Sequence, residues 1–126
     1  MPISSNGVLC GALGGDFLYV GAGDGKIKKI NLANGGWTLT HEALLDSKVM
    51  SINLSPDHRE LIVGTIAGKI YRVLTNDFSF LLHSDAHSSA INDVCFGKDS
   101  NNFVSIDESG AVKVWDLSEY KTVASM

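Results

Sequence analysis

Short apolar runs separated by turn-forming residues follow one another along the whole chain, without the 3.6-residue period of an amphipathic helix. In the middle of the chain these runs occupy residues 49–55, 61–65, 69–74 and 78–82. The stretches "SPDHRE", "IAG" and "TND" interrupt them, and all three contain residues that favour turns. The pattern predicts four short strands in this part of the chain.

The same arrangement occurs on both sides of this segment. Runs at 8–12, 17–20, 26–32 and 37–44 precede it, and runs at 90–96, 103–106, 111–117 and 120–124 follow it. The stretch "HEALLDS" at 41–47 has a helical composition, but it is too short for an isolated helix, so we assign it to a strand end and a loop. We therefore expect an all-β chain of twelve antiparallel strands in three four-stranded sheets, with the strands that begin near residues 8, 49 and 90 innermost.

The stretch "VGAGDGKI" at 20–27 begins like a phosphate-binding loop. Such a loop needs a Ser or Thr after the lysine and a helix behind it, whereas the chain continues as "KKINL". The stretch returns 43 residues later as "VGTIAGKI", and Gly25, Gly68 and Gly110 lie 43 and 42 residues apart. A glycine turn that recurs between two apolar runs predicts hairpins with a positive φ at glycine, rather than a nucleotide site.

Composition and charge narrow the class of protein. The 126 residues are 44% hydrophobic and 19% charged, which is typical of a globular protein. A net charge of −4 argues against binding to nucleic acid or to an anionic membrane, because both need clustered positive charge. We interpret the one basic cluster, Lys26, Lys28 and Lys29, as a solvated strand face. The chain has no long apolar run and does not begin like a signal peptide, so we expect an intracellular, unanchored protein.

Candidate reactive side chains are scattered. The histidines are spread along the chain, and Cys10 and Cys95 are too few and too far apart to suggest a disulfide framework or a zinc site. Asp107 and Glu108 are adjacent carboxylates that we place in a solvated hairpin turn. We therefore expect no catalytic site, no metal site and no cofactor.

The last third of the chain carries a more specific pattern. It reads "AH", then "AINDVCF", then "FVSIDESGAVKVWDL", and this order of motifs resembles a WD40 β-propeller blade. In that family a His, a Ser or Thr, an Asp in the turn and a Trp form a buried hydrogen-bonded tetrad. The resemblance places this tetrad on His87, Ser105, Ser109 and Trp115. Because Ser109 stands where the family has an aspartate, we expect a weakened or water-filled tetrad.

The two earlier repeats depart further from the family pattern. They have Ile30 and Val73 at the tryptophan position, and only Asp24 keeps the turn carboxylate, so we expect these blades to rely on apolar packing. The resemblance divides the chain into blades at about 7–45, 46–85 and 86–126. Since known propellers have at least four blades, we expect a part of a larger propeller, completed by further blades of a longer chain or of another copy.

The resemblance also implies a function. Propellers of this family present loops on a rigid disc, which implies a noncatalytic protein–protein interaction scaffold. The loops expected to face a partner contain Asp24, Asp46, Ser47, Lys48, Asp85 and Glu108.

A narrower likeness concerns the location. The runs "ELIVGTIAGKIYRV", "HSSAINDVCF" and "VKVWDL" resemble the WD-repeat proteins of cilia and flagella, which implies axonemal proteins, including the tubulin of doublet microtubules, as partners. Two alternatives stay open. One is a peptide or phosphopeptide reader, which would need an Arg or Lys cluster where only Lys48 lies; the other is a nucleotide-binding enzyme.

Overall fold

The computed structural model describes residues 7–45, 47–85, 87–98, 101–117 and 121–125. Its first sheet contains β1 (Val8–Gly14), β2 (Phe17–Ala22), β3 (Lys26–Asn31) and β4 (Thr38–Leu44), with a short 3-10 helix η1 (Ala33–Gly35) before β4. The second contains β5 (Val49–Leu54), β6 (Glu60–Thr65), β7 (Lys69–Leu74) and β8 (Phe80–Asp85). The third contains β9 (Ile91–Phe96), β10 (Asn102–Asp107), β11 (Val112–Asp116) and β12 (Lys121–Ser125).

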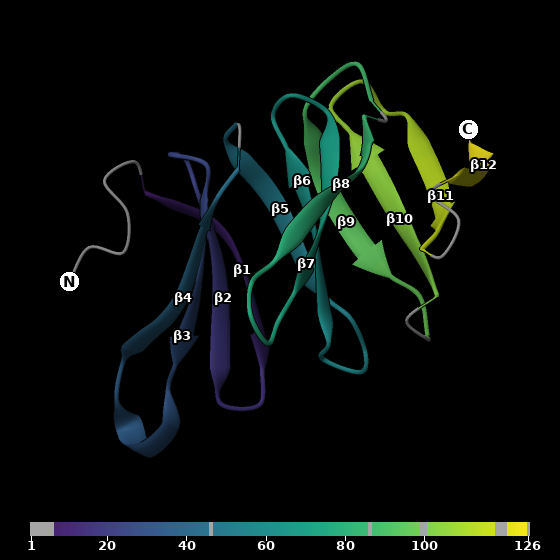
Figure 1. Ribbon diagram of the computed structural model, residues 1–126. Helices are drawn as coiled ribbons and strands as arrows, with labels where there is room; N and C mark the ends of the chain where they lie inside the picture. Colours follow the sequence, from purple (N-terminus) through teal and green to yellow (C-terminus); the bar gives the residue numbers. More distant parts are fainter. Residues whose placement is uncertain (1–6, 46, 86, 99–100, 118–120, 126) are drawn as a thin grey trace.

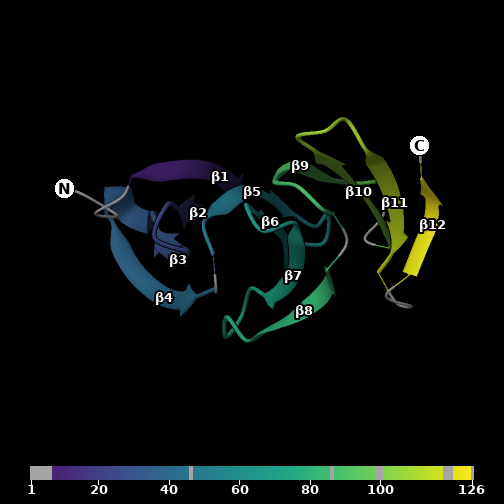
Figure 2. The ribbon, with the colours of Figure 1, turned by 90° about the horizontal axis from the view of Figure 1, so that it is seen from above.

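The strands of each sheet follow one another in chain order, and every pairing is antiparallel. Figure 1 shows the three sheets side by side, and Figure 2 shows them from above with β4 and β8 far from β1 and β5. The first strands contact one another, β1 with β5 and β5 with β9. The expected arrangement of twelve strands in three sheets is confirmed.

Glycines in the second strands set the distance between the sheets. A Cβ atom on Gly21 of β2 would lie 2.3 Å from Cγ1 of Val49 on β5, and one on Gly64 of β6 would lie 2.5 Å from Cγ2 of Ile91 on β9. Both positions therefore need a residue without a side chain. The first strand of each following sheet packs into the notch that such a glycine leaves.

The recurring turn glycines have the backbone conformation that the repeat predicts. Gly25, Gly68 and Gly110 have φ of 86°, 83° and 94° in the turns that follow β2, β6 and β10. Only glycine adopts this region without a steric penalty. The hairpin interpretation is confirmed at all three turns, and the helix that a phosphate-binding loop requires does not follow Lys26, where the structure has β3.

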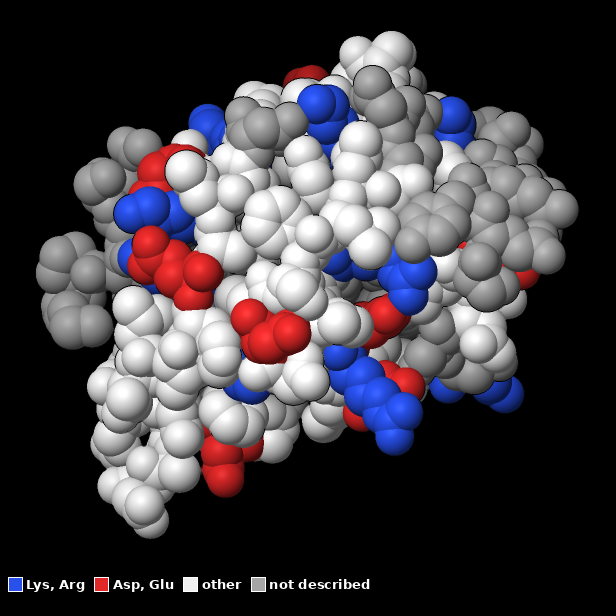
Figure 3. Space-filling view, in the orientation of Figure 1, with Lys and Arg blue, Asp and Glu red and all other residues white. Residues whose placement is uncertain are grey.

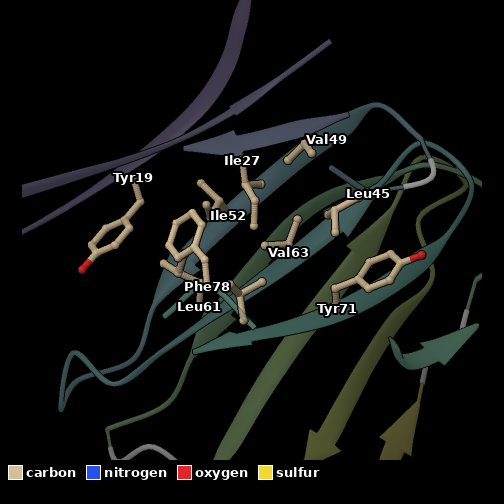
Figure 4. Close-up of a cluster of buried hydrophobic side chains, with 10 residues drawn as sticks. Tyr19, Ile27, Leu45, Val49, Ile52, Leu61, Val63, Tyr71 and Phe78 are labelled. Atoms are coloured by element: carbon tan, nitrogen blue, oxygen red, sulfur yellow. The ribbon is translucent and has the colours of Figure 1, made fainter. Parts of the chain in front are cut away.

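The first and second sheets meet in an apolar core, shown in Figure 4. Tyr19 and Ile27 of the first sheet face Val63 and Val73 of the second, and all four are buried. Phe78, in the turn after β7, stacks on Tyr19 with ring centroids 6.2 Å apart although its φ is 58°, an unusual value for an aromatic residue. Burial of its ring offsets this local strain.

No helix among the described residues is long and apolar enough to cross a membrane.

Candidate functional site

Four polar side chains are buried where the third sheet meets the second. His87 lies just before β9, Ser105 and Asp107 lie on β10, and Trp115 lies on β11. Their exposed fractions are 6%, 0%, 4% and 3%. Buried polar groups destabilise a fold unless they are hydrogen-bonded, so their partners decide what this cluster does.

The four side chains form one continuous chain of hydrogen bonds. Trp115 Nε1 donates to Ser105 Oγ over 2.8 Å, and Ser105 Oγ lies 2.6 Å from His87 Nε2. His87 Nδ1 lies 2.8 Å from Asp107 Oδ2. A neutral imidazole with its proton on Nδ1 satisfies every contact, because Nδ1–H donates to the carboxylate and Nε2 accepts from the serine hydroxyl. The cluster is buried and its hydrogen-bonding groups have partners within the protein, so we assign it a structural rather than a catalytic role.

The structure brings together His87, Ser105 and Trp115, but the aspartate differs from the one expected. Ser109 is exposed in the turn, and Asp107 occupies the place that the sequence comparison gave to Ser109. The physical reason is the two-residue period of a strand, which puts Ser105 and Asp107 on the same face of β10. The expectation of a weakened or water-filled tetrad is therefore wrong. So is the placement of Asp107 in a solvated turn, whereas Glu108 is exposed there.

Ser109 supports the tetrad from outside. Its hydroxyl donates to Asp107 Oδ1 over 2.6 Å, and its backbone N–H and that of Ala111 donate to the same oxygen over 2.9 and 3.0 Å. The Ser109 hydroxyl holds the pKa of Asp107 well below its ordinary value; the bonds from His87 and Ala111 act in the same direction, and burial opposes them. The negative charge of Asp107 is therefore part of the folded structure.

Replacing Ser109 by aspartate should lower the melting temperature by several degrees, because it places a second carboxylate against Asp107 and removes a hydroxyl donor. Ser109→Asn, which keeps a donor without adding a charge, is the matched control and should melt closer to the unmodified chain. Thermal unfolding at neutral pH measures both. A stabilising Ser109→Asp would show that position 109, rather than Asp107, holds the acceptor of the tetrad.

Acid should remove the contribution of Asp107 in a defined direction. Because the folded-state pKa lies below the unfolded value, this carboxylate stabilises the fold above about pH 4 and loses that effect as the pH falls further. Ser109→Ala should move acid unfolding to a higher pH, since the strongest donor to the carboxylate is gone. Circular dichroism during acid titration measures the shift, and Ser88→Ala at an exposed serine is the control. Identical midpoints for Ser109→Ala and the unmodified chain would contradict this assignment.

The imidazole of His83 packs against the tetrad from the side of the second sheet. His83 of β8 packs edge-on against Phe103 and Trp115, with ring centroids 5.2 and 5.6 Å apart. Burial lowers the pKa of His83, and the positive charge of Arg72 adds to this effect. The seam between the second and third sheets therefore holds a neutral histidine in an apolar setting.

The second sheet fills the equivalent four positions differently. The backbone bond from Leu45 N to Gly25 O matches that from His87 N to Gly68 O, which places Leu45 at the histidine position. Val63, Thr65 and Val73 take the places of the serine, aspartate and tryptophan, and all four side chains are buried. Three of the four are apolar, as the sequence predicts for this repeat, and the hydroxyl of Thr65 bonds to the backbone of Lys69 in its own hairpin.

Two long cations join neighbouring sheets, and the sequence interpretation missed both. Lys29 of β3 donates to the carbonyl of Thr75 over 2.6 Å, and Arg72 of β7 donates to the carbonyl of Leu117 over 3.2 Å. Lys29 is only 8% exposed, so its placement on a solvated face is wrong. Its position two residues from Ile27, which faces the core, was the available signal.

Replacing Lys29 by methionine should lower the free energy of unfolding by about 1–2 kcal/mol, because the buried Thr75 carbonyl loses a charged donor while the aliphatic stem remains. Lys26→Met is the matched control on the same strand: its ammonium is half-exposed and pairs with Glu42 at 3.3 Å, so we expect a change under about 0.5 kcal/mol. Urea unfolding measures both variants. Equal effects would mean that the contact with Thr75 contributes nothing.

The loops expected to face a partner lie at one edge of the sheets, the upper edge in Figure 1. Lys48 and Glu108 are exposed, whereas Ser47 and Asp24 are half-buried, and the carboxylate of Asp24 accepts from Lys26 N within its own turn. Asp46 lies outside the described residues. Asp85 ends β8, and its side chain also lies outside the described part.

The described residues contain no group of three or more His, Cys, Asp or Glu side chains that could hold a metal ion.

Comparison with known proteins connects this geometry to a family. The family model "WD domain, G-beta repeat" matches residues 78–116, which run from β8 through β11. The human protein "WD repeat-containing protein 90" is 28% identical over 85 residues, which are 68% of this chain and 5% of that protein. The chain thus spans a small part of this relative.

Solved structures show the same architecture. "Structure of U3-55K" superposes with a TM-score of 0.89 at 19% identity, over 98% of this chain and 40% of that chain. "Crystal structure of RRP9 WD40 repeats" gives 0.88 at 19% identity, over 98% and 39% of the two chains. A computationally designed protein, Ika8, gives 0.79 at 22% identity, over 94% and 36%. At these identities the likeness concerns the fold.

The matched repeat crosses from one sheet to the next, because it joins the outer strand of the second sheet to three strands of the third. It contains all four members of the tetrad, His87, Ser105, Asp107 and Trp115. The three sheets are therefore three blades of a partial β-propeller, and residues 78–116 match the WD40 repeat model.

Proposed function

We propose that the chain is a noncatalytic module for protein–protein interaction within a larger intracellular propeller. The observation that carries this proposal is the division of polar groups between the core and one edge. The tetrad is buried and its side chains bond to one another within the blade, whereas Lys48 and Glu108 lie exposed on loops of one edge. Such an arrangement suits a rigid support that presents loops to another protein.

Backbone hydrogen bonds between the loops support this role. Leu45 N donates to Gly25 O over 2.8 Å, Ile66 N to Lys48 O over 2.9 Å, and Glu108 N to Ala90 O over 2.9 Å. Each of these bonds joins the turn between the second and third strands of a blade to a connection between two blades. Loops fixed in this way bind a partner with less loss of conformational entropy than free loops would.

The narrower proposal is that the partner is tubulin in the doublet microtubules of a ciliary or flagellar axoneme. It is supported by the resemblance of "ELIVGTIAGKIYRV" and "HSSAINDVCF" to WD-repeat proteins of cilia and flagella. Exposed Ile66 and Lys48 on the loop edge offer an apolar and a basic contact for an acidic protein surface.

Co-sedimentation with taxol-stabilised microtubules tests this proposal. We expect saturable binding to microtubules, no binding to actin filaments, and weaker binding by Lys48→Glu. Lys98→Glu makes the same charge reversal in the β9–β10 loop at the opposite end of the strands, and it should bind like the unmodified chain. Absence of microtubule binding, or equal binding to actin, would overturn the tubulin assignment. Equal losses in both lysine variants would remove the loop edge as its site.

A further inference from the structure

The face of blade 3 that is turned away from blade 2 differs in chemistry from the corresponding faces of blades 1 and 2, which pack against blades 2 and 3. We propose that it receives a further blade with a small residue at the start of its first strand and a hydrogen-bond donor nearby, and not a second copy of this chain. This inference rests on the proposal that further blades complete the propeller. Figure 2 shows the third sheet at one end of the row of sheets.

The first difference concerns the glycine notch. Gly21 pairs with Cys10, and Gly64 pairs with Ser51, and each glycine leaves room for a branched residue of the next blade. In blade 3 the same register position, opposite Asp93, holds Ile106, which is 38% exposed. The notch is therefore filled, and a valine or isoleucine of a following blade would meet the side chain of Ile106.

The second difference is a carboxylate. In blade 2 the hydroxyl of Ser51 crosses the seam and donates to the carbonyl of Ile91 over 3.2 Å. In blade 3 the equivalent residue is Asp93, which is exposed and can only accept hydrogen bonds when ionised. Against the same backbone carbonyl it would place two acceptors together, so the further blade has to supply a donor.

The third difference is the missing cation. Lys29 and Arg72 hold equivalent positions, since Leu32, Thr75 and Leu117 make the same backbone bond two residues beyond Ile30, Val73 and Trp115. Blade 3 has Val114 at this position. Blades 1 and 2 thus give a cation to the next blade, whereas blade 3 offers an apolar residue and an acceptor. A Lys or Arg on the further blade complements Asp93.

These differences exclude a second copy arranged in the same way. Val8, Val49 and Ile91 begin the first strands at equivalent register positions, opposite Ala22, Thr65 and Asp107. In a head-to-tail assembly of copies, the valine of blade 1 would come against Ile106, where both existing seams have glycine. The face therefore calls for glycine or alanine at that position of its partner.

An appended blade tests the inference on the whole chain. A copy of residues 46–85 is fused after residue 126, either unchanged or with glycine in place of the valine that corresponds to Val49. Each version is combined with the unmodified host and with Ile106→Gly, which gives four proteins. Hydrogen exchange measures protection of the first strand of the appended blade, and the two hosts without an appended blade control for damage to β10.

We expect complementary size preferences. On the unmodified host the glycine version should exchange at least tenfold more slowly than the valine version, and on the Ile106→Gly host the order should reverse. Asp93→Ser should increase protection of the unchanged copy on the Ile106→Gly host. Equal protection of both versions on each host would overturn the inference. Stronger protection of the valine version on the unmodified host, or no protection of the appended strand in any of the four proteins, would also overturn the inference.

Sedimentation velocity provides a second readout. The unmodified chain should remain monomeric at concentrations of tens of micromolar, and closed rings of several copies would overturn the inference. These outcomes can be told apart from those of the microtubule experiment, because binding through the loop edge uses different residues. Failure of one experiment leaves the other meaningful.

Discussion

Trp115→Ala should lower the free energy of unfolding by about 3–5 kcal/mol, which is comparable with the total stability of many domains. The indole is 3% exposed, stacks on Phe103 with centroids 6.2 Å apart, and donates to Ser105 Oγ. The substitution leaves a large cavity and removes a donor from the tetrad. Urea unfolding followed by far-UV circular dichroism measures the loss.

Trp37→Ala is the matched control for this experiment. Trp37 is 57% exposed, just before β4, so its removal should change the free energy of unfolding by less than about 1 kcal/mol. Comparable losses at the two tryptophans would show that Trp115 is not held in the seam between blades 2 and 3.

Gly68→Ala should lower the free energy of unfolding by about 3 kcal/mol or more. Its φ of 83° disfavours any side chain, and the new Cβ would lie 2.1 Å from the carbonyl oxygen of His87. The turn and the segment that carries His87 would have to move apart, which breaks the bond from His87 N to Gly68 O. The effect should therefore reach the tetrad.

Gly110→Ala separates backbone strain from the clash. Gly110 has a similar φ of 94°, but a Cβ there meets nothing within 4 Å. We expect a loss of about 1 kcal/mol from strain alone. Chemical unfolding of both variants decides the matter, and equal losses would mean that the contact between Gly68 and His87 does not constrain the turn.

Local patterns were sufficient to predict the fold. Alternating strands and turn glycines at 43- and 42-residue spacing depend on residues close in sequence, so the twelve strands and the positive φ values follow from them. His87 and Trp115 were also predictable as members of one tetrad, because the motif order resembles a known repeat. These features need no knowledge of how one blade packs on the next.

The errors arose where a side chain's role depends on register or on another blade. The family pattern places the carboxylate of the tetrad in the turn, which selected Ser109, whereas the two-residue period of β10 puts Asp107 on the same face as Ser105. Lys29 reaches a carbonyl 46 residues away, and no local pattern reveals that contact. Long-range contacts between blades therefore set the limit of prediction.

Trp115, Ser105, His87 and Asp107 stabilise blade 3 as one hydrogen-bonded unit, and a double-mutant cycle at Trp115 and Ser105 tests this. Ser105→Ala, Trp115→Phe and the double variant are unfolded in urea, and the free energies are compared. Because Ser105 Oγ accepts from Trp115 Nε1, we predict a coupling of about 1 kcal/mol or more between the two positions. Additive losses, with coupling within about 0.3 kcal/mol of zero, would show that the bond from Trp115 to Ser105 does not stabilise the blade.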